Sequence, residues 1–323
     1  MGLMRQLSHR LLPRMTTPAA PPDAPPAPHT PAAGHYRSVF RAGLFDGRVC
    51  WVTGGGSGIG RCVAHELAAL GAQVVISGRK ADKLERVRSE ITDDGGRCDT
   101  LGFDIRDEAA VKAGVAEVVG RHGRIDGLVN NAGGQFPAPL LALPKKGFEA
   151  VVASNLTGGF LMMREVFNQA MQQHGGAVVN MTADFRNGMP GMAHSGAARA
   201  GMSNLTMSAA FEWASAGVRV NAVAPGWVAS SGMDSYGPMI QPLIRQLKQH
   251  VPLARLARED EVSAAIVFLL SPAASFITGV TLAIDGGAPL GTPVFPREKT
   301  SANRAMDGLD LGFHRARPPE VLG

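Results

Sequence analysis

Short apolar runs alternate with longer amphipathic segments along the middle of this chain. The runs are rich in valine, isoleucine and other small or β-branched residues, whereas the segments between them repeat apolar positions at helical spacing. This alternation is typical of parallel strands joined by crossover helices. It predicts an α/β fold with a single doubly wound parallel sheet of about seven strands and helices on both faces. The predicted strands are Arg48–Thr53, Gln73–Ser77, Asp99–Phe103, Ile125–Asn130, Ala177–Thr182, Val218–Val223 and Val280–Ile284.

The two ends of the chain lack this pattern. Eight prolines fall from Pro13 to Pro31 among alanine and threonine, a composition that cannot bury a core. We therefore expect residues 1–41 to be a disordered Pro-rich tail. Residues 42–290 are expected to form one domain, and residues 291–323 a C-terminal extension over the surface.

The first residues leave the compartment open. Residues 1–14 carry arginine, scattered leucines and no acid, as mitochondrial presequences do, but an unstructured extension explains them as well. We expect a cytoplasmic protein, or a mitochondrial one if the source is eukaryotic. The final Val-Leu-Gly is not a peroxisomal signal.

Composition and charge argue against several classes of partner. No apolar run approaches the roughly 18 residues of a membrane span, so no membrane partner is expected. Of the net charge of +5, residues 1–41 supply +4, from five arginines and one aspartate, so the rest carries +1 and no nucleic-acid partner is expected. The three cysteines form no Cys-x-x-Cys, which indicates neither a disulfide framework nor a metal site.

A glycine-rich loop follows the first predicted strand. It reads Thr53-Gly54-Gly55-Gly56-Ser57-Gly58-Ile59-Gly60 and leads into a predicted helix at Arg61–Leu70. Between a strand and a helix, such a loop lets the backbone approach a pyrophosphate, whose charge is met by the N–H groups at the helix start. We therefore predict a Rossmann-type dinucleotide site made by Thr53, Gly54, Ser57, Gly58, Ile59 and Gly60.

Two cations follow the second predicted strand, where sheets of this kind bind the adenosine ribose. An acid there would bind the free 2′-hydroxyl of NAD, whereas Arg79 and Lys80 match a 2′-phosphate. The sequence favours NADPH over NADH. The alternative is that both are the solvated start of the next helix.

Four further segments carry a family resemblance: Asn130-Asn131-Ala132-Gly133, Asn155, Pro225-Gly226 and Asp285-Gly286-Gly287. With the glycine loop, they resemble the short-chain dehydrogenase/reductase family over residues 46–288. The resemblance implies that Asn155 orders water near the active site and that Asp104 and Ile105 hold the adenine. The other cofactor-binding residues that it implies are Asn131, Ala132, Gly133, Thr182, Arg199, Pro225, Gly226 and Val228.

The chain departs from this family at the catalytic pair. The family has Tyr-x-x-x-Lys at a helix entry, where this chain has Ser195 and Arg199. Arginine keeps the positive charge but cannot relay a proton. A small residue beside a retained cation marks the enoyl-CoA and dienoyl-CoA reductase branch. The segments that resemble trans-2-enoyl-CoA reductases are Gly134–Phe136, His194–Gly201 and Phe268–Gly279.

The resemblance suggests several roles around the substrate. Asp184 lies eleven residues before Ser195, where dienoyl-CoA reductases have a tyrosine, so it is a candidate acid; a solvated turn residue is the alternative. The predicted catalytic residues are Asn155, Asp184, Ser195 and Arg199. The predicted substrate contacts are Gln135, Phe136, His194 and Tyr236.

These features lead us to expect an NADPH-dependent oxidoreductase that reduces the C2=C3 double bond of a trans-2-enoyl-CoA or related dienoyl-CoA. One alternative is a carbonyl or alcohol oxidoreductase acting on an apolar substrate such as a terpenoid, and another is a non-catalytic dinucleotide-binding regulator. The family resemblance implies a homotetramer built through the helical segments Lys145–Gln173 and Met192–Ser215.

Overall fold

The structure, a computed structural model, describes residues 38–322 apart from 239, 291–302 and 304–318. The described residues belong to one structural unit, Ala32–Gly323. Most of the predicted tail and C-terminal extension therefore lies outside the described residues. Ser38 already belongs to the folded part, because its hydroxyl donates a 2.6 Å hydrogen bond to Glu66 and Phe40 packs against the core.

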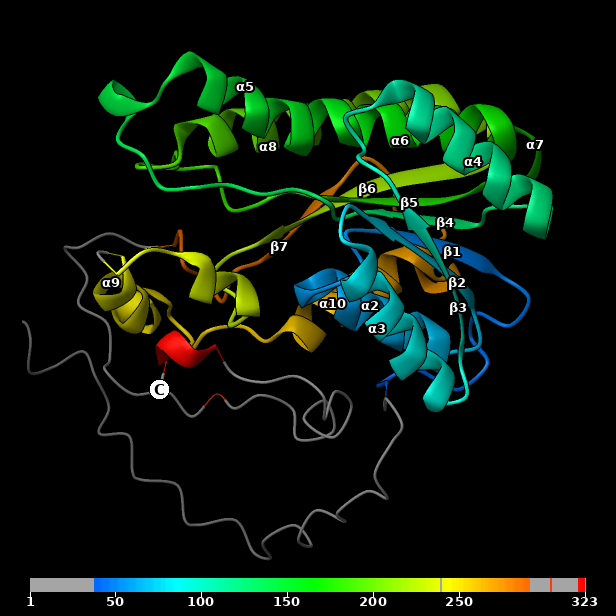
Figure 1. Cartoon of the computed structure of the whole chain (residues 1–323), viewed down its shortest axis with the longest axis horizontal. Coiled ribbons are helices and arrows are strands. Elements are labelled where there is room, and N and C mark those ends of the chain that lie inside the picture. The colour runs from blue at the N-terminus through cyan, green and yellow to red at the C-terminus, as the bar shows by residue number, and fades with distance from the viewer. Residues whose placement is uncertain (1–37, 239, 291–302, 304–318, 323) are drawn as a thin grey trace, which may run out of the picture. The chain divides into compact units, whose positions relative to one another are not determined.

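Seven strands form a single sheet in the order β3-β2-β1-β4-β5-β6-β7 (Figure 1). Every neighbouring pair is parallel, with Val49 opposite Gln73 and Cys50 opposite Gly127. The predicted fold class is confirmed, and each predicted strand overlaps an observed one. The strands are β1 (Val49–Thr53), β2 (Gln73–Gly78), β3 (Arg97–Gly102), β4 (Gly127–Asn130), β5 (Gly176–Met181), β6 (Val218–Pro225) and β7 (Thr281–Ile284).

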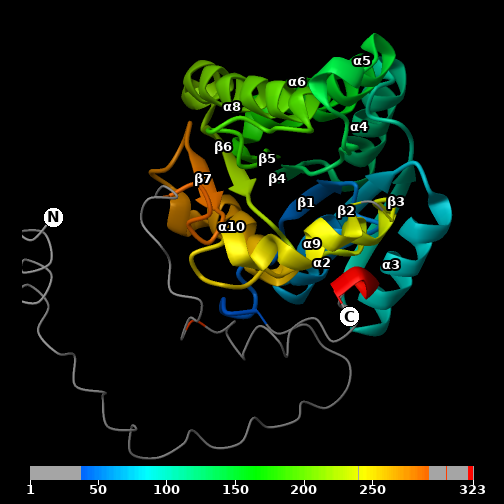
Figure 2. The same cartoon turned by 90° about the vertical axis from the view of Figure 1, so that its left-hand side faces the viewer.

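Helices cover both faces of the sheet (Figures 1 and 2). One face carries α2 (Gly58–Ala69), α3 (Ala81–Asp93) and α10 (Glu259–Leu270). The other carries α4 (Glu108–His122), α5 (Lys145–Val152), α6 (Gly158–Val166) and α8 (Ala193–Trp213). The remaining short helices in these layers are η1 (Leu140–Ala142), α7 (Gln172–His174), η4 (Ala214–Ala216) and η7 (Pro272–Ala274).

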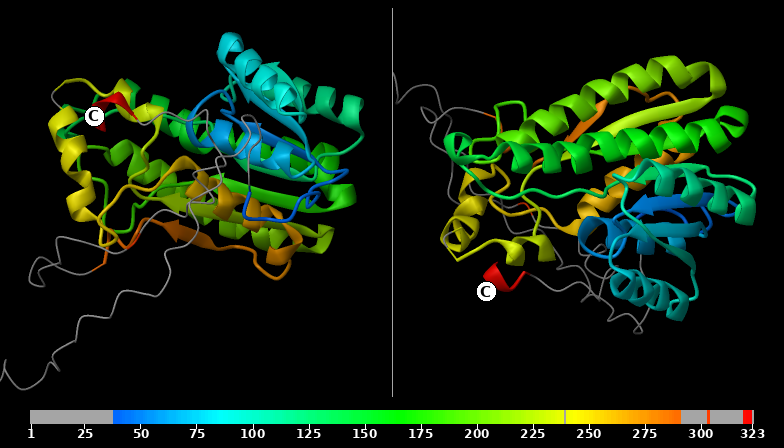
Figure 3. Two further views of the ribbon diagram at one scale, coloured as in Figure 1. Left: turned by 90° about the horizontal axis from the view of Figure 1, so that it is seen from below. Right: turned by 45° about the horizontal axis from the view of Figure 1, so that its top comes forward.

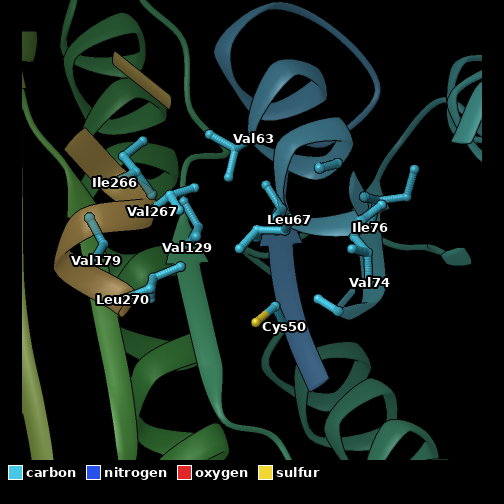
Figure 4. Close-up of a cluster of buried hydrophobic side chains, with 14 of the residues drawn as sticks. Cys50, Val63, Leu67, Val74, Ile76, Val129, Val179, Ile266, Val267 and Leu270 are labelled. Atoms are coloured by element: carbon cyan, nitrogen blue, oxygen red, sulfur yellow. The ribbon is translucent and has the colours of Figure 1, made fainter. Parts of the chain in front are cut away.

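A core cluster lies on each side of the sheet. Leu67 of α2 and Ile266 of α10 pack toward the sheet on one side (Figure 4). Trp51 of β1 and Met162 of α6 belong to the cluster on the other side. A central strand covered on both faces is expected to be apolar throughout, and every side chain of β1 is buried. No helix in the described part of the chain is long and apolar enough to cross a bilayer.

The strand order reverses between β1 and β4. These strands are neighbours, although the chain runs outward from β1 to β3 before it returns to β4. The connections that leave the carboxyl ends of β1 and β4 therefore pass to opposite faces of the sheet. In open α/β sheets this switch point is where ligands bind.

The predicted helical segment Lys145–Gln173 is not a regular α-helix. Two π-helical segments, η2 (Ala153–Thr157) and η3 (Phe167–Met171), interrupt it. A single π turn within a helical segment changes the spacing of apolar positions too little to be recognised in the sequence. Asn155 lies within η2, and π turns inside α-helices occur frequently at functional sites.

Between β6 and α10 the chain leaves the sheet and forms three short helices (Figure 3). We call residues 231–250 the lid segment. Its helices are η5 (Ser231–Ser235), α9 (Gln241–Gln246) and η6 (Leu247–His250). The short helix η8 (Glu320–Leu322), red in Figures 1 and 2, lies beside it.

Candidate active site

Two side chains tie the glycine-rich loop to the end of β4. Thr53 Oγ1 accepts hydrogen bonds from the backbone N–H groups of Asn131 and Ala132, both at 3.0 Å. The Asn131 side-chain amide donates to the carbonyl oxygens of Thr53 and Gly54, at 3.0 and 3.3 Å. These bonds hold together the carboxyl ends of β1 and β4, on the two sides of the switch point.

The loop requires glycine at three of its predicted site positions. Gly54 and Gly58 have φ of +68° and +58°, in the left-handed region that side chains disfavour. A Cβ on Gly60 would lie 2.4 Å from Asn131 Nδ2 and 2.5 Å from the Gly54 carbonyl oxygen. The loop is therefore packed directly against the Asn131 side chain and the Ala132 backbone at the end of β4, with no space for a side chain of its own at Gly54 or Gly60.

The start of α2 fits the phosphates of a dinucleotide. Ser57 is the N-cap, yet its side chain makes no capping hydrogen bond, so it leaves the first N–H groups of α2 uncapped. Such N–H groups bind anions. Ile59 packs its side chain against the core, which fixes this first turn.

The cations that follow β2 are exposed. Arg79 and Lys80 lie between β2 and α3, and neither is buried against the core. The nearby Asp104 accepts from Arg106 Nε at 3.0 Å, and this bond, with further help from the charge of Arg79, lowers the pKa of Asp104. Ile105 is buried, and its Cδ1 lies 2.7 Å from where a Cβ on Gly158 would be.

The side chain of Asn155 holds the backbone of the loop that follows β4. Asn155 Oδ1 accepts from the Gly134 N–H at 2.9 Å, and Asn155 Nδ2 donates to the Gly134 carbonyl oxygen at 3.0 Å. A Cβ on Gly133 would lie 2.5 Å from Asn155 Oδ1 and 3.2 Å from an Arg199 guanidinium nitrogen. Asn155 thus fixes the backbone that passes directly in front of Arg199.

The residue at the family's tyrosine position bonds to this same loop. Ser195 is fully buried in the first turn of α8, and its hydroxyl donates to Gln135 Oε1 at 2.6 Å. Gln135 Nε2 lies 3.5 Å from the hydroxyl of Tyr236, which belongs to the lid segment. The structure therefore brings together three of the predicted residues, from the loop after β4, from α8 and from the lid segment.

His194 presents an unused nitrogen in this region. The Ser195 N–H donates to His194 Nδ1 at 2.9 Å, which assigns the proton of the neutral ring to Nε2. His194 is fully buried, and its Nε2 has no partner among the described residues. The ring of Phe136 meets it edge to face at 4.6 Å. His194 can thus donate to a ligand atom, provided that the ligand displaces or passes Phe136.

Arg199 brings a buried positive charge to the site. Its Nη1 donates to the Met181 carbonyl oxygen at 2.6 Å, while its Nε has no partner among the described residues. Burial lowers the pKa of Arg199 to about 10, so the guanidinium is still charged at neutral pH. No acidic side chain of the described residues forms an ion pair with it. An unpaired buried cation with a free donor favours an anionic ligand or a developing negative charge.

Asp184 is half-buried after β5, where its N–H donates to the Pro225 carbonyl oxygen at 3.2 Å. Burial, together with the negative charge of Asp285, raises the pKa of the Asp184 carboxyl. Thr182 donates its hydroxyl to the Val223 carbonyl oxygen at 2.8 Å, so it has only lone pairs to offer a ligand.

The loop after β6 is fixed by backbone bonds. The Gly226 N–H donates to the Ile284 carbonyl oxygen at 3.0 Å, and Val228 forms an isolated β-bridge with Ala257. A Cβ on Gly226 would lie 2.9 Å from the Asp285 Cα. Asp285 is thus close to both this loop and Asp184.

Sequence reasoning missed the contributions of Gly134 and Asp285. Gly134 acts through its backbone, which no side-chain pattern reveals. Asp285 belongs to the Asp-Gly-Gly segment that marked the end of the family resemblance, but its charge relation to Asp184 depends on the meeting of β5, β6 and β7. The pairing of Gln135 with Ser195 likewise joins residues from separate strand ends.

Comparison with known proteins places this site in a family. A family model described as enoyl-(acyl carrier protein) reductase matches residues 54–289. The chain is 34% identical to a peroxisomal 2,4-dienoyl-CoA reductase of Danio rerio, over 78% of this chain and 85% of that protein. It is 36% identical to a 3-oxoacyl-(acyl-carrier-protein) reductase of Staphylococcus aureus, over 73% of this chain and 96% of that protein.

A solved structure shares more of the sequence. It is described as a citronellol catabolism dehydrogenase of Pseudomonas aeruginosa PAO1, and it is 57% identical with a TM-score of 0.72. The match covers 79% of this chain and 100% of that one. The sheet order, the glycine loop tied to the end of β4, and these matches together show that the chain is an oxidoreductase of the short-chain dehydrogenase/reductase family.

Proposed function

We propose that this protein is an NADPH-dependent reductase of the C2=C3 double bond of a trans-2-enoyl-CoA or a related 2,4-dienoyl-CoA. The observation that carries the proposal is the pair at the entry of α8: Ser195 donates to Gln135, and Arg199 is a buried, unpaired cation. A carbonyl reductase of this family uses a tyrosine there to move a proton to or from oxygen. A relative is named as a (3E)-enoyl-CoA-producing 2,4-dienoyl-CoA reductase, which supports reduction of a conjugated acyl-CoA; on a dienoyl-CoA such a product requires hydrogen to be added at C2 and C5.

The site suits a reaction that builds negative charge on a thioester oxygen. A bound reduced nicotinamide supplies the hydride that adds to the β-carbon of the conjugated thioester. The fixed charge of Arg199 and the Nε2–H of His194 stabilise the resulting enolate oxygen, because both are already desolvated and need no reorganisation. Asn155 contributes as a positioning residue, since it fixes the loop through Gly134.

A proton must then reach the α-carbon. We assign this role to Asp184, which follows β5 beside the Pro225 carbonyl oxygen, because burial and the neighbouring Asp285 raise its pKa and so keep more of it protonated. Tyr236 is the second candidate, since its hydroxyl reaches Gln135.

One observation favours a second function. The solved structure that is 57% identical is named as a dehydrogenase of citronellol catabolism, which keeps open an alcohol or carbonyl oxidoreductase of an apolar terpenoid. That chemistry needs an acid/base at the hydroxyl of the substrate, and Ser195 and Arg199 do not supply the family's usual one. The enoyl reductase is therefore the preferred proposal.

The test of the reaction is a substrate panel with the full chain. Consumption of NADPH is expected with trans-2-enoyl-CoA and 2,4-dienoyl-CoA thioesters, and not with citronellal, nor in reverse with citronellol and NADP⁺. Product masses should show two added hydrogens, and NMR should place them at C2 and C3 of the product of the trans-2-enoyl-CoA. As a matched probe, the double variant Ser195→Tyr/Arg199→Lys should not improve enoyl-CoA reduction. Turnover of the terpenoid alone would replace the proposal with the second function.

The cofactor preference depends on Arg79. We expect a higher kcat/KM with NADPH than with NADH, and Arg79→Ala should weaken NADPH binding by about 10- to 150-fold, since one hydrogen bond to a charged group contributes about 1.5–3 kcal/mol. NADH binding should change little. The exposed Lys112→Ala on α4 removes a charge on the opposite face and is the control. Equal affinity of the unmutated protein for both cofactors would contradict the assignment.

The acid is tested by Asp184→Asn, which keeps the shape and removes the proton. If Asp184 is the acid, kcat should fall by roughly 100-fold while NADPH affinity stays the same. Because an acid must be protonated to act, kcat of the unmutated enzyme should fall as pH rises through the raised pKa of Asp184, and the variant should lose this dependence. The control is Asp93→Asn, at the exposed end of α3. An unchanged kcat, with a deuterated-cofactor isotope effect showing that chemistry limits the rate, passes the role to Tyr236.

The loop held by Asn155 offers a matched glycine pair. Gly133→Ala should lower kcat by about 100-fold, because its Cβ would meet Asn155 Oδ1 at 2.5 Å and displace the loop in front of Arg199. Gly134→Ala is the control, since its Cβ would have no atom within 4 Å. Steady-state kinetics of both variants test this, and equal losses would show that the Asn155 contact is not what matters.

A further inference from the structure

The lid segment has a small apolar cluster of its own, separate from the two clusters of the sheet. Its buried members are Met233, Ile244 and Leu247 from the lid and Val321 from η8, each no more than 6% exposed. No other described side chain between residues 231 and 250 is buried. The lid therefore completes its core only with a residue from far along the chain.

The backbone of Val321 is also bound at both of its polar groups. Its N–H donates to Asp234 Oδ1 at 3.0 Å, and its carbonyl oxygen accepts from Arg245 Nε at 3.0 Å. Asp234 lies in η5 and Arg245 in α9, so one residue of η8 connects two helices of the lid. Figures 1 and 2 show η8 beside α9 in both directions of view.

The same cluster supports the residue through which the lid reaches the site. Tyr236 and Ile240 pack against it, partly buried. The Tyr236 hydroxyl lies 3.5 Å from Gln135 Nε2, and Gln135 accepts from Ser195 at 2.6 Å. Val321 thus belongs to the cluster against which Tyr236 packs, and Tyr236 is connected to Ser195 through Gln135.

A segment with so few buried side chains has little local stability of its own. Without Val321 the cluster would open to water beside Met233, Ile244 and Leu247, and Asp234 and Arg245 would lose their shared partner. Among the described residues, no member of this cluster belongs to the sheet or to the glycine loop, so we expect cofactor binding not to depend on Val321.

We propose that Val321 is a positioning residue for substrate, which clamps the lid segment in the placement that brings Tyr236 to Gln135. This proposal rests on the proposed function for the identity of the substrate, but the clamp itself is a property of the fold. It acts on the capture of the acyl thioester and leaves the nicotinamide site unchanged.

Hydrogen–deuterium exchange tests the clamp in the full chain with NADPH bound. Val321→Asp places a charge in the cluster and should speed exchange of amides in residues 231–250 by about tenfold or more, with β1, β4 and β5 unchanged. Val321→Ala should give a smaller increase in the same segment. The control is Glu320→Gln, in the same turn but exposed, which should exchange like the unmutated protein. Equal lid exchange in Val321→Asp and the control would overturn the proposal.

Kinetics separate a positioning role from a merely structural one. With trans-2-hexenoyl-CoA, Val321→Asp should raise KM by about tenfold or more and change kcat less. The Kd for NADPH and the melting temperature of the protein should stay the same. Faster lid exchange with an unchanged KM would refute the positioning role. If the unmutated protein turns over no enoyl-CoA, the proposed function fails, and the exchange data alone then decide whether Val321 clamps the lid.

Discussion

The hydrogen bonds between Thr53 and the Asn131–Ala132 backbone connect two strand ends from which the rest of the site is built. β1 and β4 are adjacent in the sheet, but their outgoing loops pass to opposite faces. The Asn131 amide, bonded to the carbonyl oxygens of Thr53 and Gly54, keeps those loops from separating. One loop leads to the helix start that fits a pyrophosphate, and the other leads to Gly133, Gly134 and Gln135. The distance between the phosphate site and the reacting end is therefore determined by this connection.

On that frame, the replacement of a tyrosine by Ser195 changes more than one functional group. A tyrosine would bring a phenol to this position, whereas the serine hydroxyl donates to Gln135 Oε1 at 2.6 Å. A cation is present at Arg199, and in the proposed reaction its burial strengthens its interaction with a developing oxyanion. The site has thus lost a proton-transfer residue and kept its charge stabilisation. Proton transfer and charge stabilisation are different requirements, and reduction of a conjugated thioester depends more on charge stabilisation than on a proton-transfer residue at this position.

Much of the fold could be predicted because its signals are local. The strands are apolar runs between helical segments, and the glycine loop lies at the strand–helix junction that its chemistry needs. The positions of Ser195 and Arg199 could be predicted by resemblance. The remaining features join distant parts of the chain. Gln135 and Tyr236 are 101 positions apart in the sequence, so no hydrophobic periodicity could predict their contact. The position of Val321 could not be predicted either, because the sequence around it has no helical or strand periodicity. The π turn at Asn155 could not be predicted, because the spacing of apolar residues does not show whether a backbone N–H bonds to the carbonyl four or five residues before it.

That π turn has an effect on the outer surface of the molecule. A π turn holds more residues than an α turn, so it rotates everything that follows it in the helix. The turn that lets Asn155 face Gly134 therefore also decides the direction of Leu156 and Phe160. These two side chains line a surface hollow against α8, where a Cβ on Gly201 would lie 3.0 Å from Leu156 Cδ2. The position of Asn155 in the site and the direction of Leu156 on the surface thus depend on the same backbone irregularity.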